Sequence, residues 1–120
     1  MHSCLLFTLC HRQFEGQPGQ VAYTASKGAL ASMTFPTSHD LAHHAFHIVM
    51  IAPGAFSSAM TAQLPEKARR SLDGNGGLVY PQRFGKPDEF AKTVRWAIEV
   101  PYVNGEVVRL SGAGRLPGKL

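Results

Sequence analysis

Tyr23 and Lys27 are the two residues of this 120-residue chain whose types and spacing are best suited to chemistry. Four positions apart on a helix, their side chains would lie on one face, about one turn apart. A phenol is a poor proton donor or acceptor at neutral pH, but a nearby ammonium group favours the phenolate. Such a pair can exchange a proton with a hydroxyl or carbonyl oxygen. Because this spacing also arises by chance, the surrounding elements have to support the assignment.

The first elements around this pair are a helix and a buried strand. Residues 21–43 indicate a long helix whose first half is rich in small residues. Pro36 should kink this helix or at least interrupt one of its hydrogen bonds. A nearly continuous apolar run over 46–52 stops at Pro53-Gly54, which is typical of a strand buried on both faces.

The C-terminal half should add further helices and one more strand. Range 57–72 indicates one or two short helices broken at Pro65. A helix with proline in its first turn should run from Pro87 to about Val100, and a last strand should cover 106–110. This alternation predicts an α/β fold.

Composition and charge exclude several classes of protein. The chain is 44% hydrophobic and 17% charged, as expected of one ordinary globular domain. The net charge of +4 comes from scattered basic residues with Arg69-Arg70 as the only adjacent pair, so no nucleic-acid partner is predicted. Small anionic molecules such as nucleotides or coenzyme A thioesters would suit such a surface.

The two cysteines and the apolar runs bear on the compartment. Cys4 and Cys10 form no C-x-x-C, so a reducing compartment is expected and no disulfide framework. No run approaches the roughly 20 apolar residues of a membrane span. The opening residues 1–12 are a poor match to both a signal peptide and a mitochondrial presequence.

Several motifs in order resemble a known family. They are Tyr23-x-x-x-Lys27, Pro53-Gly54 after the strand, Arg-Phe-Gly-Lys-Pro-Asp-Glu-Phe over 83–90 and Asn-Gly-Glu-Val-Val over 104–108. Together they resemble the C-terminal half of the short-chain dehydrogenase/reductase family. In finer detail, residues 14–116 are similar to its branch of mitochondrial type-2 3-hydroxyacyl-CoA dehydrogenases, which also oxidise hydroxysteroids.

The resemblance implies a fold, an activity and a set of site residues. The fold would be the C-terminal half of a doubly wound, Rossmann-like parallel sheet. The activity would be NAD-dependent hydride transfer with a 3-hydroxyacyl-CoA or a hydroxysteroid. Tyr23 would be the general acid/base, and Lys27 would assist it and bind the nicotinamide ribose. The other implied positions are Gln17 near the substrate and, beside Tyr23 and Lys27, Pro53, Gly54, Phe56 and Ser58 at the cofactor.

The resemblance also implies partners and a location. The segment 57–80 would form a mobile flap over the substrate. The helix that starts at Tyr23, the helix from Pro87 and the last strand would supply the subunit contacts of a tetramer. The location would be mitochondrial, and the lack of a clear presequence leaves a cytoplasmic location open.

Two departures from the family pattern are important. No G-x-x-x-G-x-G or G-x-G-x-x-G, the turn that holds a dinucleotide pyrophosphate, occurs in the chain. Cys10 stands where the family's catalytic serine should lie, and a thiol is a weak hydrogen-bond donor. We therefore divide the chain into a divergent segment, 1–13, and a partial family domain, 14–120.

These departures support an alternative function and two physical expectations. The alternative is a catalytically dead truncated isoform that only oligomerises with full-length subunits. NAD binding by the isolated chain should be weak or absent. The strand 46–52 should lose partners and leave an unpaired edge, which predicts marginal stability and aggregation or dimerisation.

Other polar residues have competing interpretations. His39, His43 and His47 are spaced by four and could face a metal on one continuous helix, but the helix should end near His44, so solvated positions are favoured and no metal is predicted. Cys10 as a reactive thiol is a weaker alternative. Core or subunit-interface positions are expected for Phe90, Trp96 and Ile98.

Overall fold

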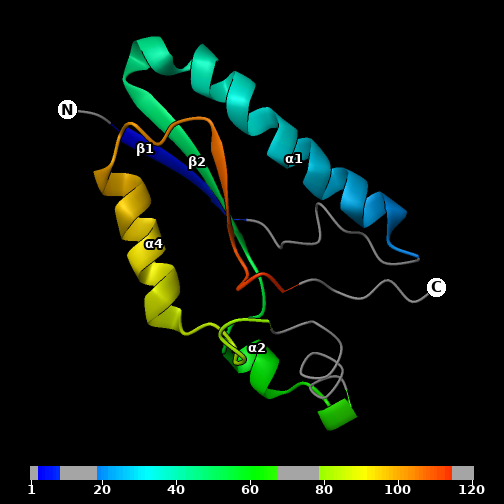
Figure 1. The fold of residues 1–120 in the computed structure, drawn as a ribbon. Helices are drawn as coiled ribbons and strands as arrows, with labels where there is room; N and C mark the ends of the chain where they lie inside the picture. The colour runs from blue at the N-terminus through cyan, green and yellow to red at the C-terminus, as the bar shows by residue number, and fades with distance from the viewer. Residues whose placement is uncertain (1–2, 9–18, 68–78, 115–120) are drawn as a thin grey trace.

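The computed structural model describes residues 3–8, 19–67 and 79–114. Its elements in chain order are β1 (Ser3–Thr8), α1 (Val21–Asp40), the 3₁₀ helix η2 (Ala42–His44), β2 (Phe46–Pro53), α2 (Ala59–Ala62), α4 (Pro87–Glu99) and β3 (Glu106–Leu110) (Figure 1).

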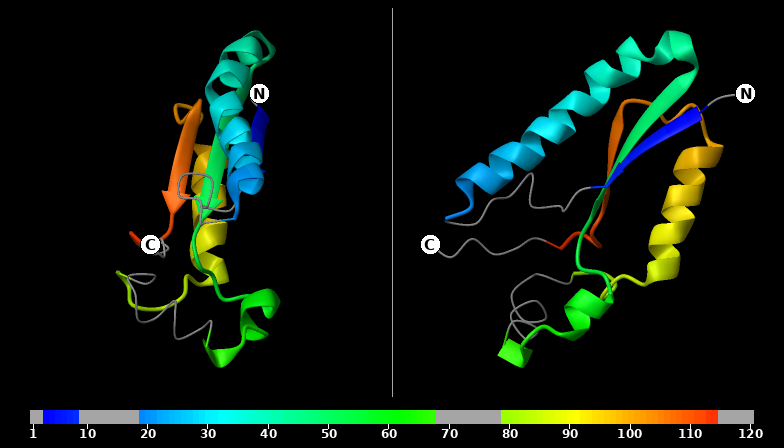
Figure 2. Two further views of the ribbon diagram at one scale, coloured as in Figure 1. Left: turned by 90° about the vertical axis from the view of Figure 1, so that its right-hand side faces the viewer. Right: turned by 180° about the vertical axis from the view of Figure 1, so that it is seen from behind.

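The strands form one parallel sheet with β2 in the middle, in the order β1-β2-β3 (Figure 2). Helix α1 packs mainly against β2 and β3, and α4 packs on the opposite face against β1 and β2. Parallel strands covered by helices on both faces are the arrangement expected of an α/β fold. The predicted fold class, part of a Rossmann-like sheet, is confirmed.

The core is centred on β2, where residues 48–52 are completely buried. Successive side chains of a strand point to opposite faces, and the contacts follow this rule. Met50 faces α1, where its Sδ lies 3.8 Å from the hydroxyl oxygen of Thr34. His47 faces α4, where its Nε2 lies 2.9 Å from the carbonyl oxygen of Ala97. Burial on both faces explains why the strand shows no polar alternation.

Helix α1 ends three residues before the predicted His43 and contains Pro36. The chain then passes through η2 to Ala45, whose φ of 60° is left-handed and turns the backbone into β2. The far end of the helix lies close to the turn before β3, because a Cβ on Gly105 would lie 2.8 Å from the Ser38 hydroxyl oxygen. This close approach explains why Ser38, a small polar residue, is buried.

Helix α4 matches its predicted bounds, and both of its ends have a physical cause. Pro87 occupies the first turn, and the Glu89 carboxylate accepts a hydrogen bond of 2.7 Å from the Lys86 backbone N–H. At the other end, residue 101 is a proline and has no N–H for the carbonyl of Ala97. His47 contacts that carbonyl instead.

Two expectations about this part of the chain are wrong. Strand 46–52 does not lose its partners, because β1 and β3 pair with it on both sides. The segment 3–8, for which no strand was predicted, supplies one of these partners. Within the described residues the unpaired edges of the sheet therefore belong to β1 and β3, not to β2.

One exposure differs from expectation, and two others exclude the core alternative while leaving a subunit-interface position open. His47 is buried and not solvated, whereas His39 and His43 are exposed as predicted. Trp96 and Ile98 are exposed on α4, so neither is a core residue of this chain. The remaining aromatic residue of that set, Phe90, is half-buried and packs edge-on against Phe56.

Candidate functional site

Tyr23 and Lys27 lie together in the first turns of α1. The Lys27 Nζ is 5.6 Å from the centroid of the Tyr23 ring, so the two side chains share one face of the helix as predicted. The Tyr23 side chain is 42% exposed and is accessible to a ligand from solvent. A cation above an aromatic face is also weakly attracted to it, which helps to hold Lys27 beside the phenol.

The start of α1 lies at a particular edge of the sheet. Helix α1 runs antiparallel to β2, so its first turn lies toward the carboxyl ends of β2 and β3 (Figure 1). Ligands of open α/β sheets bind outside the carboxyl ends of the strands. The segment that leaves β2 at this edge starts with Gly54, where a Cβ would lie 2.8 Å from the Ser111 Cα. Glycine is needed here for the two strand ends to approach.

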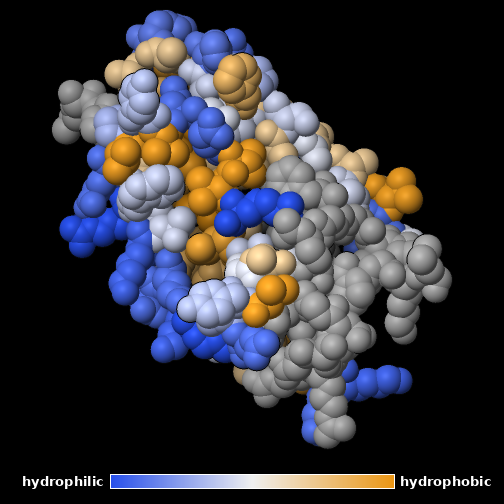
Figure 3. Space-filling model, viewed as in Figure 1, coloured by the Kyte–Doolittle hydropathy of each residue, from blue (hydrophilic) through white to orange (hydrophobic). Residues whose placement is uncertain are grey.

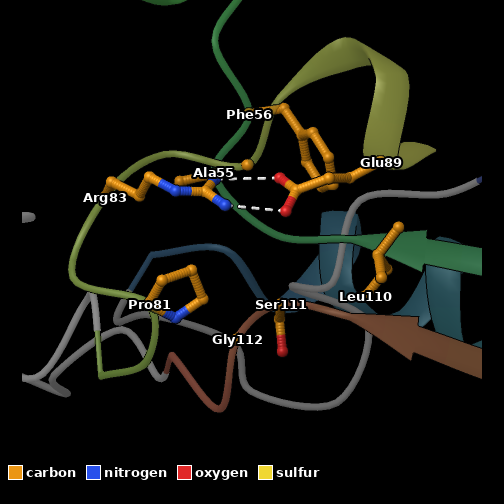
Figure 4. Close-up of a pocket in the computed structure, with 9 residues that line it drawn as sticks. Ala55, Phe56, Pro81, Arg83, Glu89, Leu110, Ser111 and Gly112 are labelled. Atoms are coloured by element: carbon orange, nitrogen blue, oxygen red, sulfur yellow. Dashed lines mark hydrogen bonds and ion pairs between the residues drawn. The ribbon is translucent and has the colours of Figure 1, made fainter.

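A cavity of about 160 Å³ opens at the same edge. Its walls come from the segment after β2, the segment before and within the start of α4, and the end of β3 (Figure 4). The described residues that line it are Ala55, Phe56, Pro81, Arg83, Gly85, Glu89, Leu110, Ser111 and Gly112.

The wall of this cavity is held together by a bidentate ion pair. The Arg83 guanidinium donates hydrogen bonds of 2.9 and 2.7 Å to the two carboxylate oxygens of Glu89. These bonds and the Lys86 N–H lower the pKa of Glu89 from 4.5 to about 2, and the carboxylate in turn raises the pKa of Arg83. Backbone hydrogen bonds from Gly85 N–H to the Ala55 carbonyl and from the residue after Phe56 to the Gly85 carbonyl join the two segments.

The structure brings some predicted site residues together and separates others. Of the predicted cofactor residues, Phe56 lines the cavity, and Pro53 and Gly54 lead into it. Ser58 instead caps α2, where its hydroxyl accepts a hydrogen bond of 3.2 Å from the Thr61 N–H. Tyr23 and Lys27 stand at the same edge of the sheet but do not line this cavity. Gln17 and Cys10 lie outside the described residues, as do residues 68–78 of the predicted flap, 57–80.

The sequence interpretation assigned no site role to Arg83, Glu89, Ser111 or Gly112. A signal for the first two was available, since an arginine lies just before a helix with Pro87 at its start and Glu89 at its third position. Nothing in the sequence indicated that the residues after β3 would face this loop.

The described ranges hold neither a metal-binding cluster nor a membrane-spanning helix. No group of three or more His, Cys, Asp or Glu residues is arranged there to hold a metal ion. His39 lies in α1, His43 in η2 and His47 in β2, so these residues do not share one helix. No described helix is both long and apolar enough to cross a bilayer.

Comparison with known proteins assigns the family. The sequence pattern of the short chain dehydrogenases matches residues 6–69, which is more than half of the chain. The chain belongs to the short-chain dehydrogenase family. It is 48% identical to the 3-hydroxyacyl-CoA dehydrogenase type-2 of Mus musculus and 46% identical to that of Homo sapiens. Each alignment covers 86% of this chain and 39% of the relative.

A solved structure agrees with this assignment. The crystal structure of 3-hydroxyacyl-CoA dehydrogenase type-2 from Mycobacterium avium matches this chain with a TM-score of 0.87 and 34% identity. The match covers 98% of this chain and 45% of that one. The chain therefore spans about two fifths of the length of the relatives it matches.

Proposed function

We propose that this short-chain dehydrogenase supplies the proton-transfer part of an NAD-dependent oxidoreductase site. The substrate class would be a 3-hydroxyacyl-CoA or a hydroxysteroid, by similarity to the relatives named 3-hydroxyacyl-CoA dehydrogenase type-2. The observation that carries the proposal is the Tyr23–Lys27 pair, with 5.6 Å between the Lys27 Nζ and the phenol ring, at the carboxyl edge of a parallel sheet.

The chemistry follows from these two side chains. In the oxidising direction the Tyr23 oxygen accepts the proton of the substrate hydroxyl, and in the reducing direction it returns a proton to the carbonyl oxygen. Lys27 stabilises the phenolate form of Tyr23, which is present before it accepts a proton and after it donates one. NAD, when bound, supplies the hydride acceptor. Gln17 would contact the substrate from the segment before α1.

The residues present suit only one end of that cofactor. Phe56 lines the cavity at the exit of β2, directly after Pro53 and Gly54, so this segment would receive the nicotinamide. Ser58 would contribute through its backbone, because its hydroxyl caps α2. Pro53 fixes the backbone where the strand ends. The chain has no glycine-rich turn for the pyrophosphate, so the other end of the dinucleotide would have to be held by residues that this chain lacks.

A second candidate function is a non-catalytic subunit, a truncated isoform that associates with full-length relatives. The same lack of a pyrophosphate turn favours it. Its contacts would come from α1, α4 and β3, the surfaces expected in a homo- or mixed tetramer. A mitochondrial location belongs to the same proposal.

One assay separates the two candidates. NADH oxidation with acetoacetyl-CoA is measured for the chain alone and for the chain mixed with a full-length relative. The catalytic proposal expects activity that falls by about 100-fold or more in Tyr23→Phe, while Tyr102→Phe, at a tyrosine that is 98% exposed, leaves it unchanged.

The other outcomes are equally informative. Dose-dependent inhibition of the relative, with no turnover by the chain alone, supports the non-catalytic subunit. Activity that survives Tyr23→Phe contradicts the assigned role of the phenol.

A further inference from the structure

The outer edge of β1 has a defined hydrogen-bonding pattern. The backbone N–H of Ser3 donates to the carbonyl of Ala45, the residue before β2, at 3.0 Å. Backbone groups of successive strand residues point to opposite edges, so Ser3, Leu5 and Phe7 bond toward β2. The N–H and C=O groups of the alternate residues, Cys4, Leu6 and Thr8, therefore point away from the sheet. Within the described residues β1 pairs only with β2.

This edge lacks the features that normally prevent strands from pairing between molecules. Strand β1, with the sequence Ser-Cys-Leu-Leu-Phe-Thr, contains no charge and no proline. Its register with β2 runs without a bulge from Ser3 opposite Phe46 to Thr8 opposite Ile51. Natural edge strands are usually protected by charges, prolines or bulges. An edge of this kind is expected to be covered.

The opposite edge of the sheet differs in charge. Strand β3 also contributes hydrophobic residues to the surface between α1 and α4 (Figure 3), but it carries Glu106 and Arg109. The carbonyl of its last residue, Leu110, accepts a hydrogen bond of 2.9 Å from Gly54 N–H, so the N–H of Val107 points outward. This edge supplies a matched comparison for β1.

The side chains of β1 on one face are hydrophobic and lie at the margin of the covering helix. The Cys4 Sγ lies 3.9 Å from the Ala97 carbonyl oxygen of α4, so the even-numbered side chains face α4. Leu5 and Phe7 point to the other face and are half-buried. Because α1 packs mainly against β2 and β3, these two side chains extend the apolar face beyond the helix.

We propose that β1 pairs with β1 of a second copy of this chain, antiparallel and about a two-fold axis at Leu6. In an antiparallel pair, residues with outward backbone groups exchange both hydrogen bonds when they stand opposite each other. Leu6 then faces Leu6 of the partner subunit, and Cys4 faces the partner's Thr8. Leu5 packs against the partner's Phe7, twice by symmetry. No charged side chains meet, and one continuous sheet runs through both copies.

The test compares proline variants by sedimentation velocity over a range of concentrations. The wild-type chain should be a reversible dimer. Leu6→Pro removes the outward N–H at the axis and no hydrogen bond to β2, so the dimer dissociation constant should rise by about tenfold or more. Val107→Pro removes an outward N–H from the edge of β3 and should leave the dimer unchanged.

Three results would overturn the proposal. They are a monomeric wild-type chain, a dimer that Leu6→Pro leaves intact, or a dimer lost only in Val107→Pro, which would assign the β3 edge. Hydrogen exchange of the wild-type chain tests the pairing of β1 with β1 even if Leu6→Pro does not fold. The amides of Cys4, Leu6 and Thr8 should be protected only at concentrations that form the dimer. Protection in the monomer would show that another segment of the same chain covers β1.

Discussion

Ala45 shows how a single backbone angle sets the path between α1 and β2. Its φ is 60° and its ψ is 33°, a left-handed conformation that brings the Cβ of an L-residue close to the backbone. Its carbonyl nevertheless accepts the hydrogen bond that starts the pairing of β1 with β2. The conformation is therefore maintained by the sheet.

Ala45→Gly should stabilise the chain by about 0.5–1 kcal/mol, because glycine adopts this conformation without the steric cost. The measurement is the free energy of unfolding from urea denaturation. Ala91→Gly, in the interior of α4 where helical backbone is needed, is the control and should destabilise the chain by about 1 kcal/mol. A loss of stability in Ala45→Gly would contradict the prediction.

His47 stabilises the end of α4. Its Nε2 is 2.9 Å from the Ala97 carbonyl, a group that Pro101 leaves without its helical partner. His47→Leu should lower the free energy of unfolding by about 1–3 kcal/mol, because the Ala97 carbonyl loses its strong donor and keeps only the weak Cys4 thiol, at 3.9 Å. His44→Leu, at an exposed histidine, should change it by less than about 0.5 kcal/mol. Equal effects in the two variants would contradict this role.

At the scale of elements, the sequence predicted the helices and strands whose signals lie within or next to the element itself. The bounds of β3 and α4 agree with prediction, because the turn at Asn104-Gly105 and the proline at Pro87 mark their starts. The apolar run of β2 was also enough to predict a strand, because a strand that is buried on both faces is apolar at successive positions. Strand β1 was missed, because a short apolar run near the start has no periodicity that identifies a strand.

The end of α1 and the cavity depended on contacts that no local pattern reveals. The helix was predicted to reach His43, yet it ends at Asp40, and Ala45 turns the chain into β2. The spacing of Tyr23 and Lys27 was local and was predicted. The meeting of Phe56 with Ser111 across one cavity was not, since it depends on the pairing of β2 with β3.

The start of α4 predicts a dependence of stability on pH. Hydrogen bonds from Arg83 and the Lys86 N–H lower the pKa of Glu89 to about 2, from an ordinary value of 4.5. The ionised carboxylate therefore stabilises the fold fully above about pH 4.5, and this contribution is lost as pH falls toward 2. Glu89→Gln should flatten the decline of the unfolding free energy across this window.

A control with another carboxylate tests that assignment. Glu99 also pairs with an arginine, because Arg95 lies one turn before it in α4 and 2.6 Å separates Nε from Oε1. The Glu99 side chain is 56% exposed, against 38% for Glu89. Glu99→Gln should leave the pH dependence between 2 and 4.5 close to that of the wild-type chain. If both variants flatten the curve equally, Glu89 has no special role at the start of the helix.

At the scale of the whole molecule, the chain combines a well-packed sheet with a sequence that lacks the glycine-rich pyrophosphate turn. The central strand is buried between helices on both faces, so the loss of partners expected for it does not occur. The chain nevertheless spans 39% of the length of its mouse relative and has no glycine-rich pyrophosphate turn. Folding and cofactor binding should therefore be separable properties of this chain.

Isothermal titration of the folded chain with NAD tests this separation. In the proposed site, the Tyr23–Lys27 pair and the loop after Pro53 would contact the nicotinamide end alone, whereas helix N-termini and glycine-rich turns supply much of the affinity for the phosphates. Losing those charge-assisted hydrogen bonds, at about 1.5–3 kcal/mol each, should weaken binding at least about a hundredfold relative to a full-length relative. Nicotinamide mononucleotide, which lacks the adenosine half, should bind this chain about as well as NAD does. A dissociation constant for NAD in the low micromolar range would show that other residues replace the missing turn.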